Sequence, residues 1–146
     1  MPLTGEYEPS PVGFVAEQVE LYERTGGAEG DTLQDRPVVI LTTRGARSGK
    51  IRKTPLMRIT DGTRYAVVAS QGGAPTNPFW YHNIVADPHV SLQDGAVARD
   101  YVARRVEGEE REKWWAMAVQ TWPDYEEYRK RTDRDIPVFV LEPSSS

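Results

Sequence analysis

Two Asp-Gly pairs constrain the fold of this chain more than any other feature, because each separates two short apolar runs. The pairs are Asp61-Gly62 and Asp94-Gly95. Tight hairpin turns need residues that tolerate a positive φ, so each pair predicts two antiparallel strands joined by a short turn. Short antiparallel strands leave exposed edges, and closing the sheet removes them. The pattern therefore favours a barrel, with a sandwich of a sheet and helices as the alternative.

The apolar runs around these turns are rich in β-branched residues, which favour strands. We expect about six mostly antiparallel strands, over residues 37–43, 54–60, 65–70, 89–93, 96–106 and 136–141. Apolar periodicity predicts flanking helices over residues 12–25, 79–86 and 124–131, and a further helix that begins near Glu109. Asn77 is expected to cap the second helix, with Pro78 as its first residue. The prediction is an α+β, mainly β fold in a single domain, residues 1–146, with an N-terminal helical segment, residues 1–30, and a disordered tail, residues 143–146.

The composition excludes several classes of chemistry. The sequence has no cysteine and only two histidines, His82 and His89. Disulfides and thiolate nucleophiles are therefore excluded, and we expect no metal site. The net charge of −4 argues against general nucleic-acid binding. No apolar run is long enough to predict an integral membrane segment, and no export signal is recognised, so a cytoplasmic protein is expected.

The segment from Arg44 to Lys53 carries a concentration of positive charge. Between Arg44 and Thr60 there are six bases and no acid, whereas the remaining chain has 12 bases against 22 acids. Gly45 and Gly49 would let the backbone approach a ligand and expose its N–H groups, and arginine donors match phosphate. The glycine spacing does not match the nucleotide-binding P-loop. The segment predicts an anion-binding loop, with a solvated charged turn as the alternative.

Two further groups of residues are suited to ligand binding. Residues 70–73, Ser-Gln-Gly-Gly, join a strand to a helix and offer a hydroxyl, an amide and backbone donors. Tyr125 and Tyr128 lie three residues apart among charged neighbours, which favours a pocket wall over a core position, whereas Trp115 is expected in the core. No Gly-x-Ser-x-Gly elbow or catalytic triad is recognised, so an enzyme with this sequence would take its reactive atom from a cofactor.

Four blocks of sequence carry a resemblance to a known family. They are GARSGKIRKTPL, SQGGA, NPFWYHN and TDRDIPV, which begin at residues 45, 70, 77 and 132. In this order and spacing the chain resembles the deazaflavin-dependent nitroreductase family of actinobacteria, from about residue 37 to residue 143. The resemblance implies a split β-barrel, like that of FMN-binding split-barrel proteins, and coenzyme F420 (8-hydroxy-5-deazaflavin) as the cofactor.

The resemblance also implies roles for individual residues. Contacts to the phosphate and the acidic tail of the cofactor would come from Arg47, Ser48, Lys50, Arg52 and Lys53. Contacts to the ring and its ribityl chain would come from Pro55, Leu56, Met57, Ser70, Gln71, Gly72 and Gly73, with Asn77, Trp80 and Asn83 completing the cleft. The substrate would face Met57, Trp122, Tyr125 and Tyr128. Ser70, Tyr125 or Tyr128 would supply a proton.

The implied function is that of an F420H2-dependent oxidoreductase, which transfers a hydride to an electron-poor acceptor such as a quinone, enone or nitroaromatic. Met57 and Trp122 stand where nitroimidazole-reducing members carry tyrosine, so quinones and other conjugated acceptors are favoured over nitroimidazole prodrugs. Two alternatives stay open: an FMN-binding split-barrel reductase, and a non-catalytic protein that carries or sequesters F420. A homodimer is compatible with the resemblance, because split barrels commonly pair.

Overall fold

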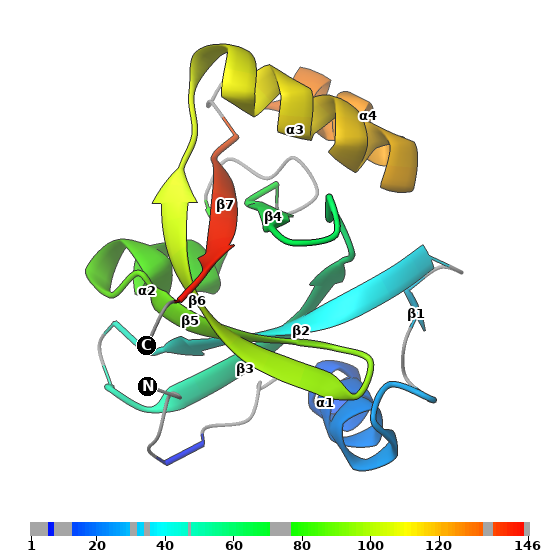
Figure 1. Ribbon diagram of the computed structural model, residues 1–146, viewed down its shortest axis with the longest axis vertical. Coiled ribbons are helices and arrows are strands. Elements are labelled where there is room, and N and C mark those ends of the chain that lie inside the picture. The colour runs from blue at the N-terminus through cyan, green and yellow to red at the C-terminus, as the bar shows by residue number, and fades with distance from the viewer. Residues whose placement is uncertain are drawn as a thin grey trace.

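The computed structural model describes residues 6–7, 13–29, 32–33, 36–46, 48–70, 77–132 and 136–144. Its strands are β1 (Thr32–Leu33), β2 (Arg36–Arg44), β3 (Ile51–Met57), β4 (Tyr65–Val68), β5 (His89–Asp94), β6 (Val97–Arg105) and β7 (Val138–Pro143). Its helices are α1 (Gly13–Thr25), α2 (Phe79–Ala86), α3 (Gly108–Thr121) and α4 (Asp124–Arg131). The helices surround a strongly curled sheet, with α1 at one end and the α3–α4 pair at the other (Figure 1).

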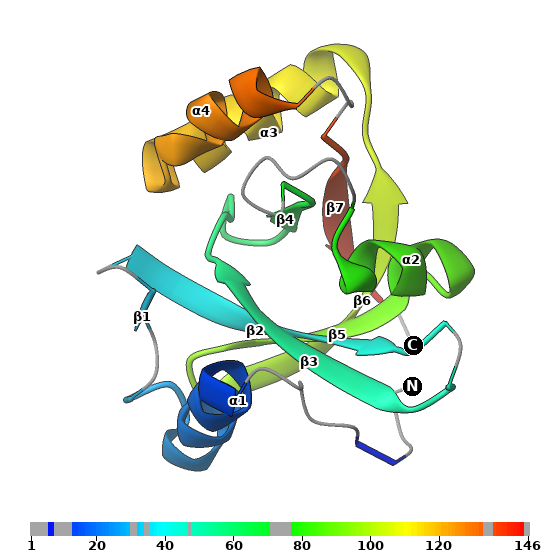
Figure 2. The same cartoon turned by 180° about the vertical axis from the view of Figure 1, so that it is seen from behind.

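The sheet is antiparallel throughout, and its six longer strands follow the order β3-β2-β5-β6-β7-β4. The two-residue β1, which sequence analysis missed, pairs with the start of β2. Curling brings the edge strands β3 and β4 to the same side of the molecule (Figure 2). Among the described residues, one bridge between Thr60 and Tyr65 joins the ends of these edges. The expected barrel is therefore formed with an opening along β3.

The two Asp-Gly turns have different outcomes. Asp94 pairs with Val97 across the turn, and Gly95 has a φ of 63°, so the predicted hairpin of β5 and β6 is confirmed. The turn at Asp61-Gly62 also forms, with Gly62 at a φ of 102°. The hairpin predicted around it is limited to a short antiparallel ladder beside the turn, where Thr60 bridges Tyr65 and the N–H of Ala66 donates to the carbonyl of Ile59. The longer ladders of β3 and β4 are formed with β2 and β7 instead. A turn motif fixes the local reversal of the chain, whereas the sheet partner depends on distant segments.

Three apolar clusters divide the interior. The first lies inside the curled sheet and includes Leu41, Leu92 and Leu141, all at most 2% exposed. The second lies between the sheet and α3–α4 and contains Trp115, as expected, together with its neighbour Trp114, which was not assigned. The third joins α1 to the outer face of β2. Helix α1 and the α3–α4 pair therefore cover different parts of the sheet.

Several predicted boundaries are corrected. The strand expected at residue 54 begins at Ile51, so much of the predicted basic loop is paired with β2. Pro78 is the N-cap of α2 rather than its first residue, and no side chain caps the helix. Strand β7 extends to Pro143, and the N–H of Ser144 donates to the carbonyl of Asp100. This pairing holds the first half of the tail that was expected to be disordered.

Within the described ranges, no helix is both long and apolar enough to cross a membrane. In the same part of the chain, no three side chains of His, Cys, Asp or Glu gather where they could hold a metal ion.

Candidate cofactor and substrate site

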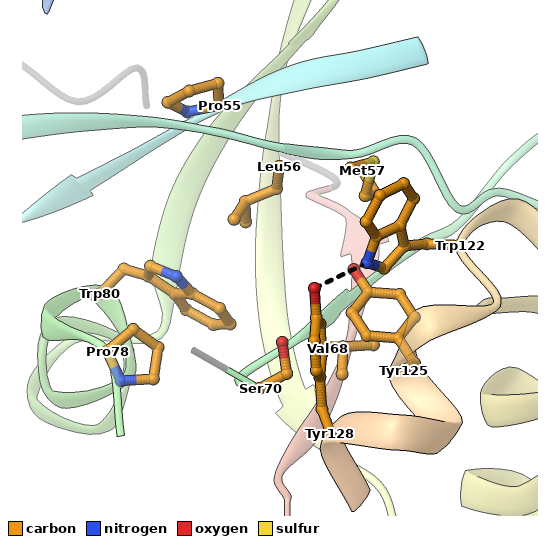
Figure 3. A pocket seen from close by; sticks show the side chains of 10 residues that line it. All are labelled: Pro55, Leu56, Met57, Val68, Ser70, Pro78, Trp80, Trp122, Tyr125 and Tyr128. Atoms are coloured by element: carbon orange, nitrogen blue, oxygen red, sulfur yellow. Dashed lines mark hydrogen bonds between the residues drawn. The ribbon is translucent and has the colours of Figure 1, made fainter. Parts of the chain in front are cut away.

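A pocket of about 270 Å³ lies beside the open part of the barrel (Figure 3). Strand β3 forms one wall, the end of β4 and the start of α2 form the floor and one side, and the segment that leads into α4 forms the other side. It is lined by Pro55, Leu56, Met57, Val68, Ser70, Pro78, Trp80, Trp122, Tyr125 and Tyr128. Eight of these ten were predicted as site residues, so the structure brings together segments that are distant in sequence. Val68 and Pro78 were not predicted.

The backbone of β3 presents polar groups toward the opening. The N–H of Gly45 donates to Lys50, and the N–H of Arg58 donates to Pro37. Because alternate residues of an antiparallel strand bond to the partner, these two bonds show that the even-numbered residues of β3 face β2. The odd-numbered residues between 51 and 57 therefore direct their N–H and C=O groups to the open edge.

Two observations agree with this assignment. The N–H of Ile51 donates to the carbonyl of Glu6, which lies outside the sheet on that edge. Pro55, which has no N–H, falls at an outward position, where proline interrupts no bond of the ladder. The N–H groups of Lys53 and Met57 on either side of it point the same way. The wall of the pocket thus offers backbone donors and acceptors to a ligand.

An aromatic wall formed by Trp122, Tyr125 and Tyr128 stands across the pocket from Pro78 and Trp80, with Met57 beside Trp122 (Figure 3). Nε1 of Trp122 donates to the hydroxyl of Tyr128 over 3.2 Å. The rings of Tyr125 and Tyr128 meet edge to face, with centroids 6.1 Å apart. Burial, together with the nearby Tyr128, raises the pKa of Tyr125 well above its usual value, so this phenol stays protonated at neutral pH.

The remaining wall holds Ser70 and Trp80. The N–H of Ala69 donates to Pro137, which fixes the chain where β4 ends and leaves Ser70 only 7% exposed. Trp80, on the first turn of α2, packs edge-on against Phe139 with centroids 6.4 Å apart. The predicted contacts Gln71, Gly72 and Gly73 follow directly but lie outside the described residues, as does Arg47.

The basic loop, residues 45–50, uses its backbone differently from what its glycines predicted. The N–H groups of Gly45 and Gly49 bond within the loop, that of Lys50 bonds to Oγ of Ser48, and that of Ala46 bonds to Asn83. Gly49 has a φ of 71°, a conformation that favours glycine, so this residue is needed for the turn of the loop. The expected exposure of these N–H groups to a phosphate is wrong. An anion at this loop would therefore be bound by the cationic side chains rather than by these N–H groups.

Asn83 holds this loop in place rather than pointing into the pocket. Its Nδ2 donates to Oγ1 of Thr43 over 3.0 Å, and its Oδ1 accepts from the N–H of Ala46 over 2.9 Å. Both Asn83 and Thr43 are buried, at 7% and 1% exposure. Helix α2, which supplies Trp80 to the pocket, is thus tied to the end of β2. Sequence analysis missed Thr43, and a Thr at the end of a strand gives no signal for this contact.

The fold pairs much of the positive charge with acids from elsewhere. Ion pairs join Arg44 to Asp87, Lys50 to Glu6, Lys53 to Glu23 and Arg58 to Asp94. Their lengths range from 2.5 Å for Lys53 to 4.0 Å for Arg44.

The two cations of β3 lie on opposite faces of the strand, because side chains alternate. Lys53 faces α1, where its ammonium meets Glu23 and the ring of Tyr7. Arg52 lies on the opposite face, which also carries Leu56, one of the three β3 residues in the pocket lining. Six other predicted cofactor contacts that the structure describes are not part of the pocket lining. They are Ser48, Lys50, Arg52, Lys53, Asn77 and Asn83.

A family model described as F420H(2)-dependent quinone reductase matches residues 14–143. The chain belongs to this family. An F420H(2)-dependent quinone reductase of Mycobacterium tuberculosis (strain ATCC 25618 / H37Rv) is 34% identical over 125 residues, which cover 83% of this chain and 84% of the relative.

Two solved structures are similar to this chain over most of their length. One, described as an F420-H2 dependent reductase (FDR-A), is 54% identical, with a TM-score of 0.70, and covers 76% of this chain and 98% of its own. The other, described as a domain-swapped dimer, is 51% identical, with a TM-score of 0.72, and covers 91% of this chain and 100% of its own. The split-barrel fold and the family resemblance expected from the sequence are confirmed.

Proposed function

We propose that this protein is a reductase that uses reduced F420 to transfer a hydride to a quinone. The observation that carries the proposal is the pocket between the open edge of β3 and the aromatic wall of Trp122, Tyr125 and Tyr128. One side offers backbone hydrogen bonds to a planar heterocycle, and the other offers aromatic surface to a planar acceptor. Membership of the family and the name of the mycobacterial relative support the same chemistry.

The ring of the cofactor fits the wall formed by residues 55–57. Pro55, Leu56 and Met57 provide apolar contact, and the outward N–H and C=O groups of β3 suit the polar edge of a deazaflavin. Trp80 and Ser70 would close the opposite side of the ring, with Gln71, Gly72 and Gly73 next to its ribityl chain. When bound, the reduced deazaflavin supplies two electrons as a hydride. The chain's own residues position the acceptor and exclude water.

The acidic tail of the cofactor would extend toward the basic loop. Arg52 lies on the face of β3 that carries Leu56, and Lys50 lies at the end of the loop, which supports both as contacts to the tail. The existing ion pair of Lys50 is exposed, and exposed pairs contribute only about 0–1 kcal/mol. A polyanionic tail can therefore replace Glu6 as its partner. Arg47 and Ser48 complete the proposed contacts, whereas Lys53 would contribute less, because Glu23 holds it on the other face.

The acceptor would lie against Met57, Trp122, Tyr125 and Tyr128. Reduction of a quinone leaves negative charge on its oxygen, and a nearby O–H group lowers the energy of that state. Three hydroxyl groups line the pocket, those of Ser70, Tyr125 and Tyr128. Each is a proposed proton donor to the reduced product.

A fluorescence titration of the purified protein with F420 tests the proposal. We expect saturable binding that weakens with added salt, followed by turnover of reduced F420 with a naphthoquinone. FMN is titrated in parallel, because FMN binding without F420 binding would favour the flavin alternative. Binding of F420 without turnover over a panel of quinones, enones and nitroaromatics would favour a carrier. Absence of F420 binding would overturn the proposal.

We also propose a homodimer, because the similar solved structure with 91% coverage of this chain is described as a dimer. Light scattering after size-exclusion chromatography measures the mass directly, and a monomer of 16.5 kDa at micromolar concentration would contradict it. The cytoplasmic location stays a prediction from the sequence.

A further inference from the structure

The hydrogen bond between Trp122 and Tyr128 has only one possible direction. An indole N–H is a donor and never an acceptor, whereas a phenol oxygen can do both. The hydroxyl of Tyr128 must therefore accept from Nε1 of Trp122 at 3.2 Å. The proton of this hydroxyl is then directed away from Trp122.

The direction that remains leads into the pocket. Figure 3 shows the Tyr128 hydroxyl among the lining side chains, with Trp122 on one side and with Ser70 and Trp80 on the other. The O–H of Tyr128 is thus presented as a donor to whatever fills the space between them.

The surroundings reinforce this arrangement. Tyr125 packs edge to face on Tyr128 and is only 6% exposed, so it limits rotation of the neighbouring ring. Trp122 is itself held by its backbone, because its N–H donates to the carbonyl of Ala118 at the end of α3. The donor geometry is therefore set by packing before any ligand arrives.

We propose that Trp122 is a specificity-determining positioning residue, which orients the Tyr128 hydroxyl as a donor and selects acceptors that present an oxygen to it. This inference rests on the proposed function, since it concerns the acceptor side of the same pocket. Quinones and enones carry such an oxygen. An electron-poor acceptor without a hydrogen-bonding atom gains nothing from the oriented hydroxyl.

Two acceptors of different chemistry test the selection. Menadione presents carbonyl oxygens, and the 10-methylacridinium cation accepts a hydride at carbon without any oxygen. In Trp122→Phe we expect the ratio of kcat/KM for menadione to kcat/KM for the acridinium to fall about tenfold, the scale of one hydrogen bond, because any loss of stacking affects both acceptors. Affinity for F420 is measured alongside and should not change. Equal losses for both acceptors would overturn the proposal.

A double-mutant cycle separates action through Tyr128 from a general packing role. Tyr128→Phe should also lower kcat/KM for menadione about tenfold. If Trp122 acts through this hydroxyl, adding Trp122→Phe to Tyr128→Phe should cause little further loss. Two independent losses that multiply would contradict the positioning role, even if each variant folds.

Indole ¹⁵N NMR gives a readout that does not depend on turnover. The protein has four tryptophans, and the signal of Trp122 is assigned as the one missing in Trp122→Phe. In Tyr128→Phe this signal should move to the position of an indole without a hydrogen bond and exchange faster with water, while the other three stay in place. An unmoved Trp122 signal would overturn the inference. Absence of F420 binding would instead overturn the proposed function and leave this result standing.

Discussion

The aromatic wall lines the pocket, whereas the basic loop lies outside the lining, and the two regions are built in opposite ways. In the aromatic wall, Tyr125 is 6% exposed, and a hydrogen bond from Trp122 orients the hydroxyl of Tyr128. In the basic loop, Lys50 is exposed and meets Glu6 only at 3.9 Å. Buried groups keep a fixed geometry, whereas exposed charges adapt to a partner at little cost.

This difference fits the two separate tasks that the family resemblance implies for these regions. The basic loop suits a long, flexible anionic tail, whose binding depends on charge more than on precise placement. The aromatic wall suits a reacting acceptor, for which orientation matters more than affinity. Substitutions in the basic loop should therefore change cofactor affinity, and substitutions in the aromatic wall should change turnover or the effect of pH.

The largest effect is expected where the basic loop is fixed to the fold. Asn83→Leu should lower the free energy of unfolding by about 2–3 kcal/mol, because it removes two hydrogen bonds and leaves the buried hydroxyl of Thr43 without its donor. Urea denaturation measures this loss, and F420 affinity should fall as well. Thr43→Val removes one of the two bonds and should cost less. Equal stability of Asn83→Leu and wild type would show that the basic loop does not depend on Asn83.

The next effect compares the two cations of β3. Arg52→Ala should weaken F420 binding by about 1–3 kcal/mol, because it removes a charge-assisted contact on the pocket face. The loss should shrink as salt rises, since salt already screens the wild-type attraction. Lys53→Ala is the matched control, with the same change in charge on the opposite face, and should cost less than about 1 kcal/mol. Equal losses of F420 affinity in the two variants would mean that the acidic tail of the cofactor does not distinguish the two faces of β3.

High pH should lower the free energy of unfolding through the aromatic wall and not through the basic loop. The pKa of Tyr125 is raised from its ordinary value of 10.0, so the folded state keeps a proton that the unfolded state releases. The stability that the protonated phenol of Tyr125 contributes is present in full below pH 10 and is lost as the pH rises above 10. Between about pH 10 and 11, Tyr125→Phe should lose less stability than wild type, by up to about 1.4 kcal/mol per pH unit.

Urea denaturation at several pH values measures the two slopes. The pKa of Tyr65 is also raised, to about 12, by burial and by its bond to Asp94, so some alkaline loss should persist in the variant. Lys53→Ala serves as the control from the basic segment and should keep the slope of wild type. Identical slopes for Tyr125→Phe and wild type would contradict the assignment.

The smallest effect has the opposite sign. Glu6→Gln removes the acid that pairs with Lys50, so it should strengthen F420 binding by about 0.5 kcal/mol. Glu23→Gln, which releases Lys53 on the other face, should leave the affinity unchanged. Both are measured by the same fluorescence titration at low salt. Weaker binding in Glu6→Gln would show that the pair prepares Lys50 for the tail rather than competing with it.

Local signals predicted the elements of this fold well. Helices α2 and α4 occupy the predicted residues, because Pro and charge patterns mark their ends. The Asp94-Gly95 hairpin was also predictable, since β5 and β6 follow each other in the chain and are neighbours in the sheet. The main partners of the strands on either side of Asp61-Gly62 were not, because the long ladder of β4 is with β7, which lies more than sixty residues further along the chain. Competition between distant partners leaves no trace in a local pattern.

For the candidate site, residue types were more predictable than their tasks. The sequence indicated that the cations and glycines between Arg44 and Lys53 belong together, and the resemblance implied the aromatic residues of the pocket. It did not indicate that Asn83 would hold the basic loop, or that Glu6 and Glu23 would meet Lys50 and Lys53. Those contacts join residues at least thirty positions apart, and they depend on how α1 and α2 pack.

The sequence by itself determined the class of fold, the absence of thiol chemistry and a segment with excess positive charge, because composition and turn residues act locally. The tertiary structure decided which of those charges face the pocket, since alternation along β3 separates Arg52 from Lys53. It also left β3 as an open edge beside the pocket, because β3 and β4 meet only beyond the end of β3, at the bridge between Thr60 and Tyr65. Both outcomes depend on strand register, which is set by the packing of the whole sheet.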